Sequence, residues 1–226
     1  MMMKRQKLDE RTLPKYTRGE EIFNMVTHIV GGVVGVTAVV LCVVFAAMHG
    51  NVYGVVGSAI YGATMIILYT CSSIYHGLKP EKKAKKVFQV IDHCSIFILI
   101  AGTYTPICLS ALREFDPRMA WWIFGIVWGA ATLGITLNAI DLRKFQTFSN
   151  ICYIAMGWTI AIAYSAYQFL VERGGIKLLL YGGIAYTVGV VFYALQLKIK
   201  YMHSIFHIFV VAGSVLHLLY ILLYIV

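Results

Sequence analysis

The residues best suited to chemistry in this chain are three histidines near the ends of apolar segments. The stretch "HSIFH" places His203 and His207 four residues apart, directly before an apolar run that continues to Val226. Residues at i and i+4 share one face of a helix, so both imidazoles can bind one ion. His76, at the end of another apolar segment, would supply a third nitrogen. Three histidines leave one tetrahedral position open, which is typical of a catalytic zinc site.

Two more polar residues are expected beside these predicted metal ligands, and we predict that both are catalytic. Asp92, in "VIDHCSIF", is the one carboxylate inside the predicted spans, where an unpaired charge is costly. Ser72 precedes His76 by about one helical turn. In a zinc site Asp92 would orient a water molecule or accept its proton, and Ser72 would bond a ligand or a substrate oxygen.

Plainer readings exist for each of these residues. An HxxxH pair on its own is more often two interfacial histidines, and Asp92 would then reach the interface or bond a neighbouring helix. The metal reading is favoured because the histidines and Asp92 are expected at one depth in the membrane.

Three other polar features rank lower. His93 is expected to face away from Asp92, since adjacent helical residues point about 100° apart. His217 lies about 21 Å beyond His203 along a helix, and either lines the same cavity or is an ordinary packed histidine. A stripe at i, i+3 and i+7 predicts a polar interior wall or an ordinary interfacial helix start; it consists of Glu21, Asn24 and His28.

Composition identifies the elements that must position these residues as membrane-spanning helices. The chain is 60% hydrophobic and only 13% charged, whereas soluble domains carry about 25% charged residues. The stretch from Ile22 to Leu78 contains no Asp, Glu, Lys or Arg, so it must hold two spans with a hairpin at Met48–Gly54. Long apolar runs without strict alternation exclude a β-barrel. The other predicted spans are Val87–Leu112, Met119–Ile140, Phe145–Val171, Leu178–Leu197 and Ser204–Val226.

These spans predict an all-α, polytopic bundle of seven transmembrane helices at 20–226, preceded by a basic tail at 1–19. Fifteen Lys and Arg residues fall on the side of the N-terminus and four on the other. The excess predicts that the N-terminus is inside and the C-terminus outside a cell (inner) membrane, with the metal site near the cytoplasmic face. The net charge of +9 is then explained by topology and by attraction to membrane lipids, with no need for nucleic acid. No protein partner is evident.

At these residues the chain resembles the hemolysin III family, within the progestin and adiponectin receptor superfamily of seven-helix membrane proteins. The matching pieces are the Glu21, Asn24, Thr27 and His28 set, the SxxxH of Ser72 and His76, Asp92 ahead of "LIAGTYTP", and "HSIFHIFVVAGSVLH". The short tail and loops look like the bacterial branch. The resemblance implies a zinc ion on His76, His203 and His207, with Asp92 on the zinc-bound water and Ser72 beside the site.

Function remains open among four classes. The first is an intramembrane zinc-dependent hydrolase of a lipid amide or ester, as the association of receptor members with lipid amide hydrolysis implies. The second is a non-catalytic membrane-homeostasis or sensory protein. The third is a cytolytic or pore-forming protein, as the family name implies, although seven spans leave no water-soluble form. A proton pump or channel has little support, because one intramembrane carboxylate does not make a relay.

Overall fold

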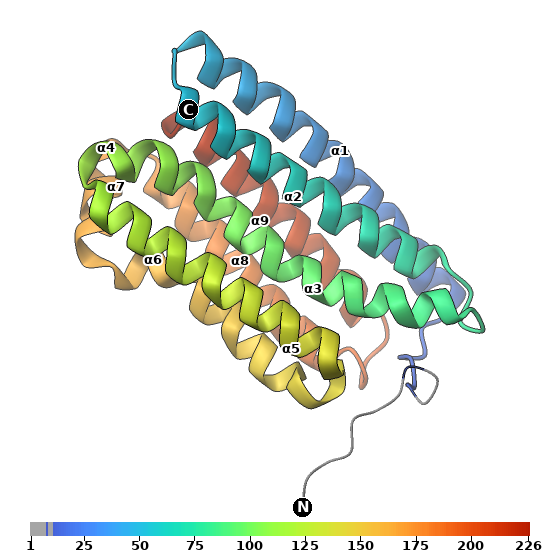
Figure 1. The fold of residues 1–226 in the computed structure, drawn as a ribbon. Helices are drawn as coiled ribbons and strands as arrows, with labels where there is room; N and C mark the ends of the chain where they lie inside the picture. Colours follow the sequence, from blue (N-terminus) through green and yellow to red (C-terminus); the bar gives the residue numbers. More distant parts are fainter. Residues whose placement is uncertain (1–7, 9–10) are drawn as a thin grey trace, which may run out of the picture.

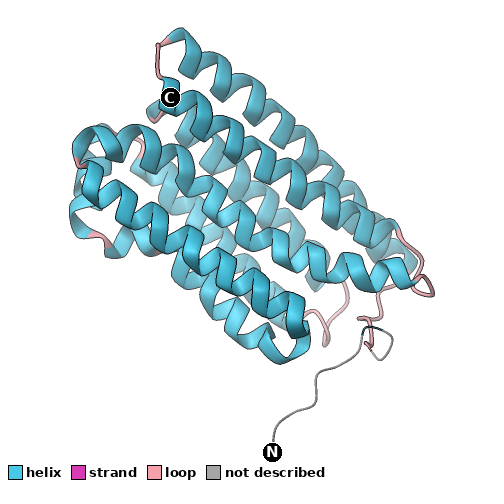
Figure 2. Cartoon of the chain, in the orientation of Figure 1, coloured by secondary structure: helices cyan, strands magenta, loops and turns pink. Residues whose placement is uncertain are grey.

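Regular structure in the described part of the chain is entirely helical, as the long apolar runs predict (Figure 2). The computed structural model describes residue 8 and residues 11–226. The first part of the predicted basic tail, with Lys4, Arg5 and Lys7, lies outside the described residues. The elements are α1 (Arg18–Met48), α2 (Val52–Gly77), α3 (Lys83–Pro106), the π-helical turn η2 (Ile107–Leu112), α4 (Arg113–Phe115), α5 (Pro117–Gly157), α6 (Thr159–Ile162), α7 (Tyr164–Arg173), α8 (Ile176–Leu195) and α9 (Met202–Tyr224).

Among the described residues, six helical segments are long and apolar enough to cross a membrane, and they form one bundle (Figure 1). They are α1, α2, α3 with its continuation to Phe115, α5, α8 and α9. In the most apolar window of the α3 segment 83% of residues are buried, against 28% for α1, so α3 is central and α1 peripheral. Many apolar side chains of α1 are exposed, as expected for a surface that faces lipid.

The expected hairpin at Met48–Gly54 is present. Helix α1 ends at Met48, Gly50 takes a positive φ of 66°, and Asn51 caps α2 by accepting a hydrogen bond from Gly54 N at 2.7 Å. The two helices then pack closely, because a Cβ on Gly62 would lie 2.2 Å from Val39 Cγ2. Small residues permit such close approach between membrane helices.

Helix α5 reverses direction at Asp141, where φ is −158° and ψ is 95°. Ser149 Oγ donates a hydrogen bond to Asn138 Oδ1 at 2.7 Å, although these residues would be about 16 Å apart along a straight helix. Asp141 Oδ1 accepts from Lys144 N at 3.1 Å and so caps the returning segment. The predicted span Met119–Ile140 ends where the chain turns, and the predicted span Phe145–Val171 is divided among the returning segment, α6 and α7.

The first and last helices are joined at their N-terminal ends by Glu20. Thr17 and Glu20 form a capping box that starts α1, in which Thr17 N donates to Glu20 Oε2 at 2.8 Å. Glu20 Oε1 accepts from Tyr201 N at 2.7 Å, where Tyr201 has a φ of 62° directly before α9. This carboxylate therefore fixes the start of α9 against the start of α1, and with it the "HSIFH" turn.

Candidate metal centre

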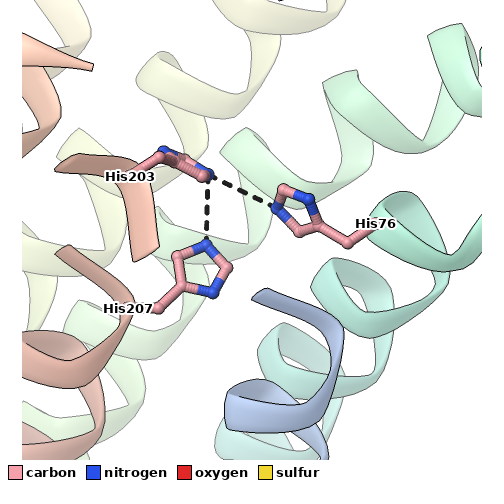
Figure 3. Close-up of side chains that lie close together, drawn as sticks. All are labelled: His76, His203 and His207. Carbon is pink, nitrogen blue, oxygen red and sulfur yellow. Dashed lines mark hydrogen bonds between the residues drawn. The ribbon is translucent and has the colours of Figure 1, made fainter. Parts of the chain in front are cut away.

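The three predicted ligands come together in the interior of the bundle (Figure 3). His76 comes from the end of α2, and His203 and His207 come from the first turns of α9. One nitrogen from each ring lies within 4.8 Å of the other two. His203 Nε2 is 3.3 Å from His76 Nε2 and 3.1 Å from His207 Nε2. All three side chains are at least 94% buried.

The outer ring nitrogens of two of these histidines are held by acceptors. His76 Nδ1 lies 2.7 Å from Glu21 Oε2, and His207 Nδ1 lies 3.2 Å from the carbonyl oxygen of Asn24. A carboxylate and a carbonyl can only accept, so Nδ1 carries the proton in both rings and the Nε2 lone pairs point inward. Outer partners of this kind orient the histidines of metal sites.

Glu21 also binds Lys85, which connects the cluster to the α2–α3 turn. Lys85 Nζ donates to Glu21 Oε1 at 2.7 Å and to Leu78 O at 2.9 Å, and lies 4.9 Å from the ring centroid of Tyr75. Lys85 is only 1% exposed. Lys85 lies in the first turn of α3 and is one of the fifteen basic residues that we predicted on the side of the N-terminus, but here it neutralises the carboxylate that holds His76.

Two of the three nitrogen–nitrogen separations in the cluster fit a tetrahedral zinc ion. With Zn–N bonds of about 2.0–2.1 Å, ligand nitrogens lie about 3.3–3.4 Å apart, close to the two Nε2 separations above. The Nε2 lone pairs of His76 and His207 both point at Nε2 of His203. A cation shared by the three nitrogens would stabilise this arrangement. The third ring, His203, has a buried Nδ1 with no hydrogen-bond partner among the described residues, and is held by stacking on Tyr16 at 5.0 Å.

Asp92 and Ser72 lie on the wall of a cavity that borders the cluster. The cavity has a volume of about 140 Å³ and is also lined by His203 and His207. Ser72 Oγ lies close to the Asp92 carboxyl but makes no hydrogen bond of normal geometry with a described residue. Asp92 is outside the group of nitrogens that could share one ion. The two predicted catalytic residues thus face the cavity next to the histidines rather than completing their ligand set.

Two more histidines belong to this site. His28 stacks on His207 with ring centroids 3.6 Å apart, is 3% exposed, and has no described partner on either nitrogen. The prediction that His93 faces away was wrong: its ring lines the cavity, and its Nε2 lies 3.1 Å from Tyr193 Oη. Helix α3 packs against both α2 and α5, and His93 contacts Tyr193 of α8, so more than one face of α3 is buried. The spacing from Asp92 alone does not reveal this.

The polar stripe of α1 contains two residues, Glu21 and Asn24, whose support of the histidine cluster was not predicted from the sequence. Glu21 holds His76, while Asn24 accepts from Ser204 Oγ at 2.7 Å through Oδ1 and from His207 through its carbonyl. The stripe therefore serves as the support of the histidine cluster as well as an interior wall. Spacing of i, i+3 and i+7 in an otherwise apolar helix is the sequence signal for such a buried polar face.

A second, more polar pocket of about 280 Å³ lies on the other side of His203. Its lining includes Arg11 and Tyr16 from the segment before α1, Arg143 after the reversal of α5, and Tyr193 from α8. Burial raises the pKa of Tyr16 above its ordinary value, so Tyr16 stays neutral and donates to Gln196 Oε1 at 2.6 Å. His93, Tyr193 and His203 line both spaces and so form the wall between them.

A multi-pass helical membrane protein, with a buried cluster of three histidines at one end of the bundle, is the class that this fold and site define. The family model described as "Haemolysin-III related" matches residues 16–218, which is most of the chain. The chain belongs to the haemolysin III family.

Two bacterial proteins are similar to this chain over nearly their whole length, and a human protein over about two thirds of its length. "Hemolysin-3" of Bacillus cereus is 36% identical over 206 residues, which cover 91% of this chain and 92% of that protein. "Hemolysin-3 homolog" of Bacillus subtilis (strain 168) is 37% identical over 199 residues, covering 88% and 91%. The human "Monocyte to macrophage differentiation factor" is 27% identical over 165 residues, covering 70% and 66%. The resemblance found from the sequence motifs is thereby confirmed.

Proposed function

We propose that this chain is an intramembrane, zinc-dependent hydrolase that cleaves an amide or ester bond in a membrane lipid. One observation carries the proposal: a cluster of three imidazoles, two of them oriented by Glu21 and Asn24, borders an apolar cavity that is also lined by Asp92 and Ser72. Three histidines leave one position of a tetrahedral ion open for chemistry.

Each part of the site has a role in such a reaction. A zinc ion bound here supplies Lewis-acid activation of water and of a substrate carbonyl. The Asp92 carboxylate orients the attacking water and takes its proton, then returns a proton to the leaving group. The Ser72 hydroxyl donates to a substrate oxygen. The apolar cavity holds the lipid chain, and the polar pocket beyond His203 gives water a path to the cluster.

The proposed topology places this reaction in the cytoplasmic leaflet of the cell membrane. In the topology that we propose, the two parts of α5 on either side of Asp141 belong to separate crossings. This makes seven crossings, with the N-terminus inside and the C-terminus outside. Arg11 and Arg143 line the polar pocket beside the histidines, and such basic residues favour the cytoplasmic side. The partners are membrane lipids, which reach the cavity within the bilayer.

The metal is tested by elemental mass spectrometry on the purified protein. We expect one zinc ion per chain in the wild type, and loss of zinc in His76→Ala and in His203→Ala. His49→Ala is the control, because His49 is exposed in the α1–α2 turn and its loss leaves the cluster intact. A folded wild type that binds no zinc after zinc is supplied would overturn the proposal.

The reaction is tested with Asp92→Asn, which we expect to keep zinc and lose hydrolysis. Release of fatty acid from ceramide-like amides and from lipid esters is measured by mass spectrometry. Zinc binding without hydrolysis of any lipid class would favour the non-catalytic alternative, in which the open position takes a ligand that the protein senses. Dye release from lipid vesicles tests the cytolytic alternative, which is supported only by the names of the bacterial relatives.

A further inference from the structure

The apolar cavity is much longer than the cluster it borders. Along α3 and into η2 its lining residues run from Asp92 to Ile107, and on α9 from His203 to His217. Those stretches correspond to about 21–22 Å along each helix. One leaflet of hydrocarbon is about 15 Å deep, so a cavity of this length that starts near the cytoplasmic face, as we propose, reaches past the bilayer midplane. Its lining between the two ends is mostly apolar, from residues such as Ile96, Ile100 and Val210.

His217 is the last residue of α9 that lines the cavity. Among the described residues, no residue of α9 beyond His217 and none of α8 before Leu179 lines the cavity. Tyr220 and Ile221, on the next turn of α9, are 0% exposed and fill the bundle beneath it. Along α8 and α9 the cavity therefore runs from the histidine cluster to His217, where its lining ends.

The imidazole of His217 is fixed in place rather than free to swing aside. Its Nε2 donates to the carbonyl oxygen of Leu179 at 3.0 Å, and its ring lies 5.4 Å from that of Tyr186. It packs directly on the bare backbone of Gly182, where an added Cβ would lie 2.2 Å from His217 Cδ2. Gly182 thus makes the room that His217 occupies, and any side chain there would push the ring into the cavity.

We propose that His217, seated on Gly182, is a chain-length stop that sets which acyl chains this protein accepts. The ligand class is a single unbranched hydrocarbon chain with its polar head at the histidine cluster and its methyl end at His217. The identity of the chain as substrate rests on the proposed function, whereas the chain-length limit rests only on the shape of the cavity and can be measured by binding alone.

Substitutions at His217 and at Gly182 should shift the longest accepted chain in opposite directions. His217→Ala removes the stop and should move the longest accepted chain upward, while Gly182→Ala should move it downward. Gly183→Ala is the matched control: a Cβ there would sit at an ordinary 3.7 Å from Trp158 Cζ2, partway along the wall. It should change the affinity for all chains alike and leave the length limit where it is.

The experiment is competition binding of lauric, myristic, palmitic, stearic and arachidic acids to the full-length protein in detergent, with and without zinc. Each buried methylene strengthens binding by about fourfold, so affinity should rise by about 15-fold per step until the chain fills the cavity, and then stop rising. We expect that break to move by at least one step in His217→Ala and in Gly182→Ala, in opposite directions. His217→Ser gives a second test of the upward shift if His217→Ala does not fold.

An unchanged break in both variants, or a break that moves equally in Gly183→Ala, would overturn the proposal. So would a zinc-binding wild type that binds none of these acids. Failure of the hydrolase proposal looks different, because the breaks and their shifts would persist in protein that binds no zinc or cleaves no lipid.

Discussion

Glu21→Gln is the most informative change at the cluster, because one carboxylate both orients His76 and neutralises a buried lysine. Glutamine retains the shape of the side chain but loses the charge, so its interaction with His76 Nδ1, 2.7 Å away in the wild type, is weakened. Loss of such an outer partner typically lowers metal affinity by about 10–100-fold. Lys85, 1% exposed, would keep only Leu78 O as a strong acceptor. Leaving a buried charge unpaired costs about 3 kcal/mol, the lower end of the usual range, since glutamine still offers an amide oxygen.

Two measurements on the same protein separate these effects. Zinc affinity is measured by competition with a chromophoric chelator, and stability by thermal unfolding in detergent without metal. In the double variant Glu21→Gln/Lys85→Met both charges are gone, so stability should largely recover. Zinc affinity should stay low, because His76 remains without its carboxylate. Wild-type zinc affinity in Glu21→Gln would refute the orienting role, and so would recovery of affinity together with stability in the double variant.

Three further predictions concern the frame around the site. Tyr16→Phe removes the hydrogen bond to Gln196 and should lower stability by about 1 kcal/mol at neutral pH. Burial raises the pKa of Tyr16 in the folded state, so the unfolded chain ionises first as the pH rises. Thermal unfolding should therefore show that the stability of the wild type falls more steeply than that of the variant above a pH of about 10. Asp141→Ala removes the cap after the reversal in α5 and should cost about 1 kcal/mol, with equal stability arguing that the carboxylate does not hold the turn. Gly62→Ala would place a Cβ 2.2 Å from Val39 Cγ2 and 2.8 Å from the backbone nitrogen of Val39. We therefore expect the variant to lose more than about 1 kcal/mol of stability in the same assay. An unchanged melting temperature would contradict the close packing of α1 and α2.

Much of the fold was accessible from the sequence because the membrane restricts the choices. Uncharged runs fix the helices, and Gly50 with Asn51 marks the first hairpin through a positive φ and a cap. The helix boundaries after Asp141 were harder to predict, because the sequence there is apolar throughout while the chain alternates between helix and turn. Hydropathy records which residues avoid water, and it is insensitive to where a backbone within the apolar region changes direction.

The cluster itself was also predictable in its members, since i, i+4 spacing and shared depth are both visible in "HSIFH" and His76. Its support was not. The role of Lys85 depends on a contact with Glu21, 64 positions away, and in the sequence it reads as one more basic loop residue. Which face of α3 carries His93 depends on how many neighbours surround that helix, a property of the assembled bundle. Long-range pairing of this kind leaves no mark in local spacing.

The joining of the first and last helices at Glu20 has a consequence for biosynthesis. His203 is 127 residues behind His76, so at about 5–20 residues per second roughly 6–25 s pass between the synthesis of the first and the second ligand. A nascent chain that stalls, or inserts without α9, lacks two of the three nitrogens and the partner of Glu20 Oε1. The proposed metal site is therefore completed last, and metal binding there would report that the whole chain has been inserted and closed.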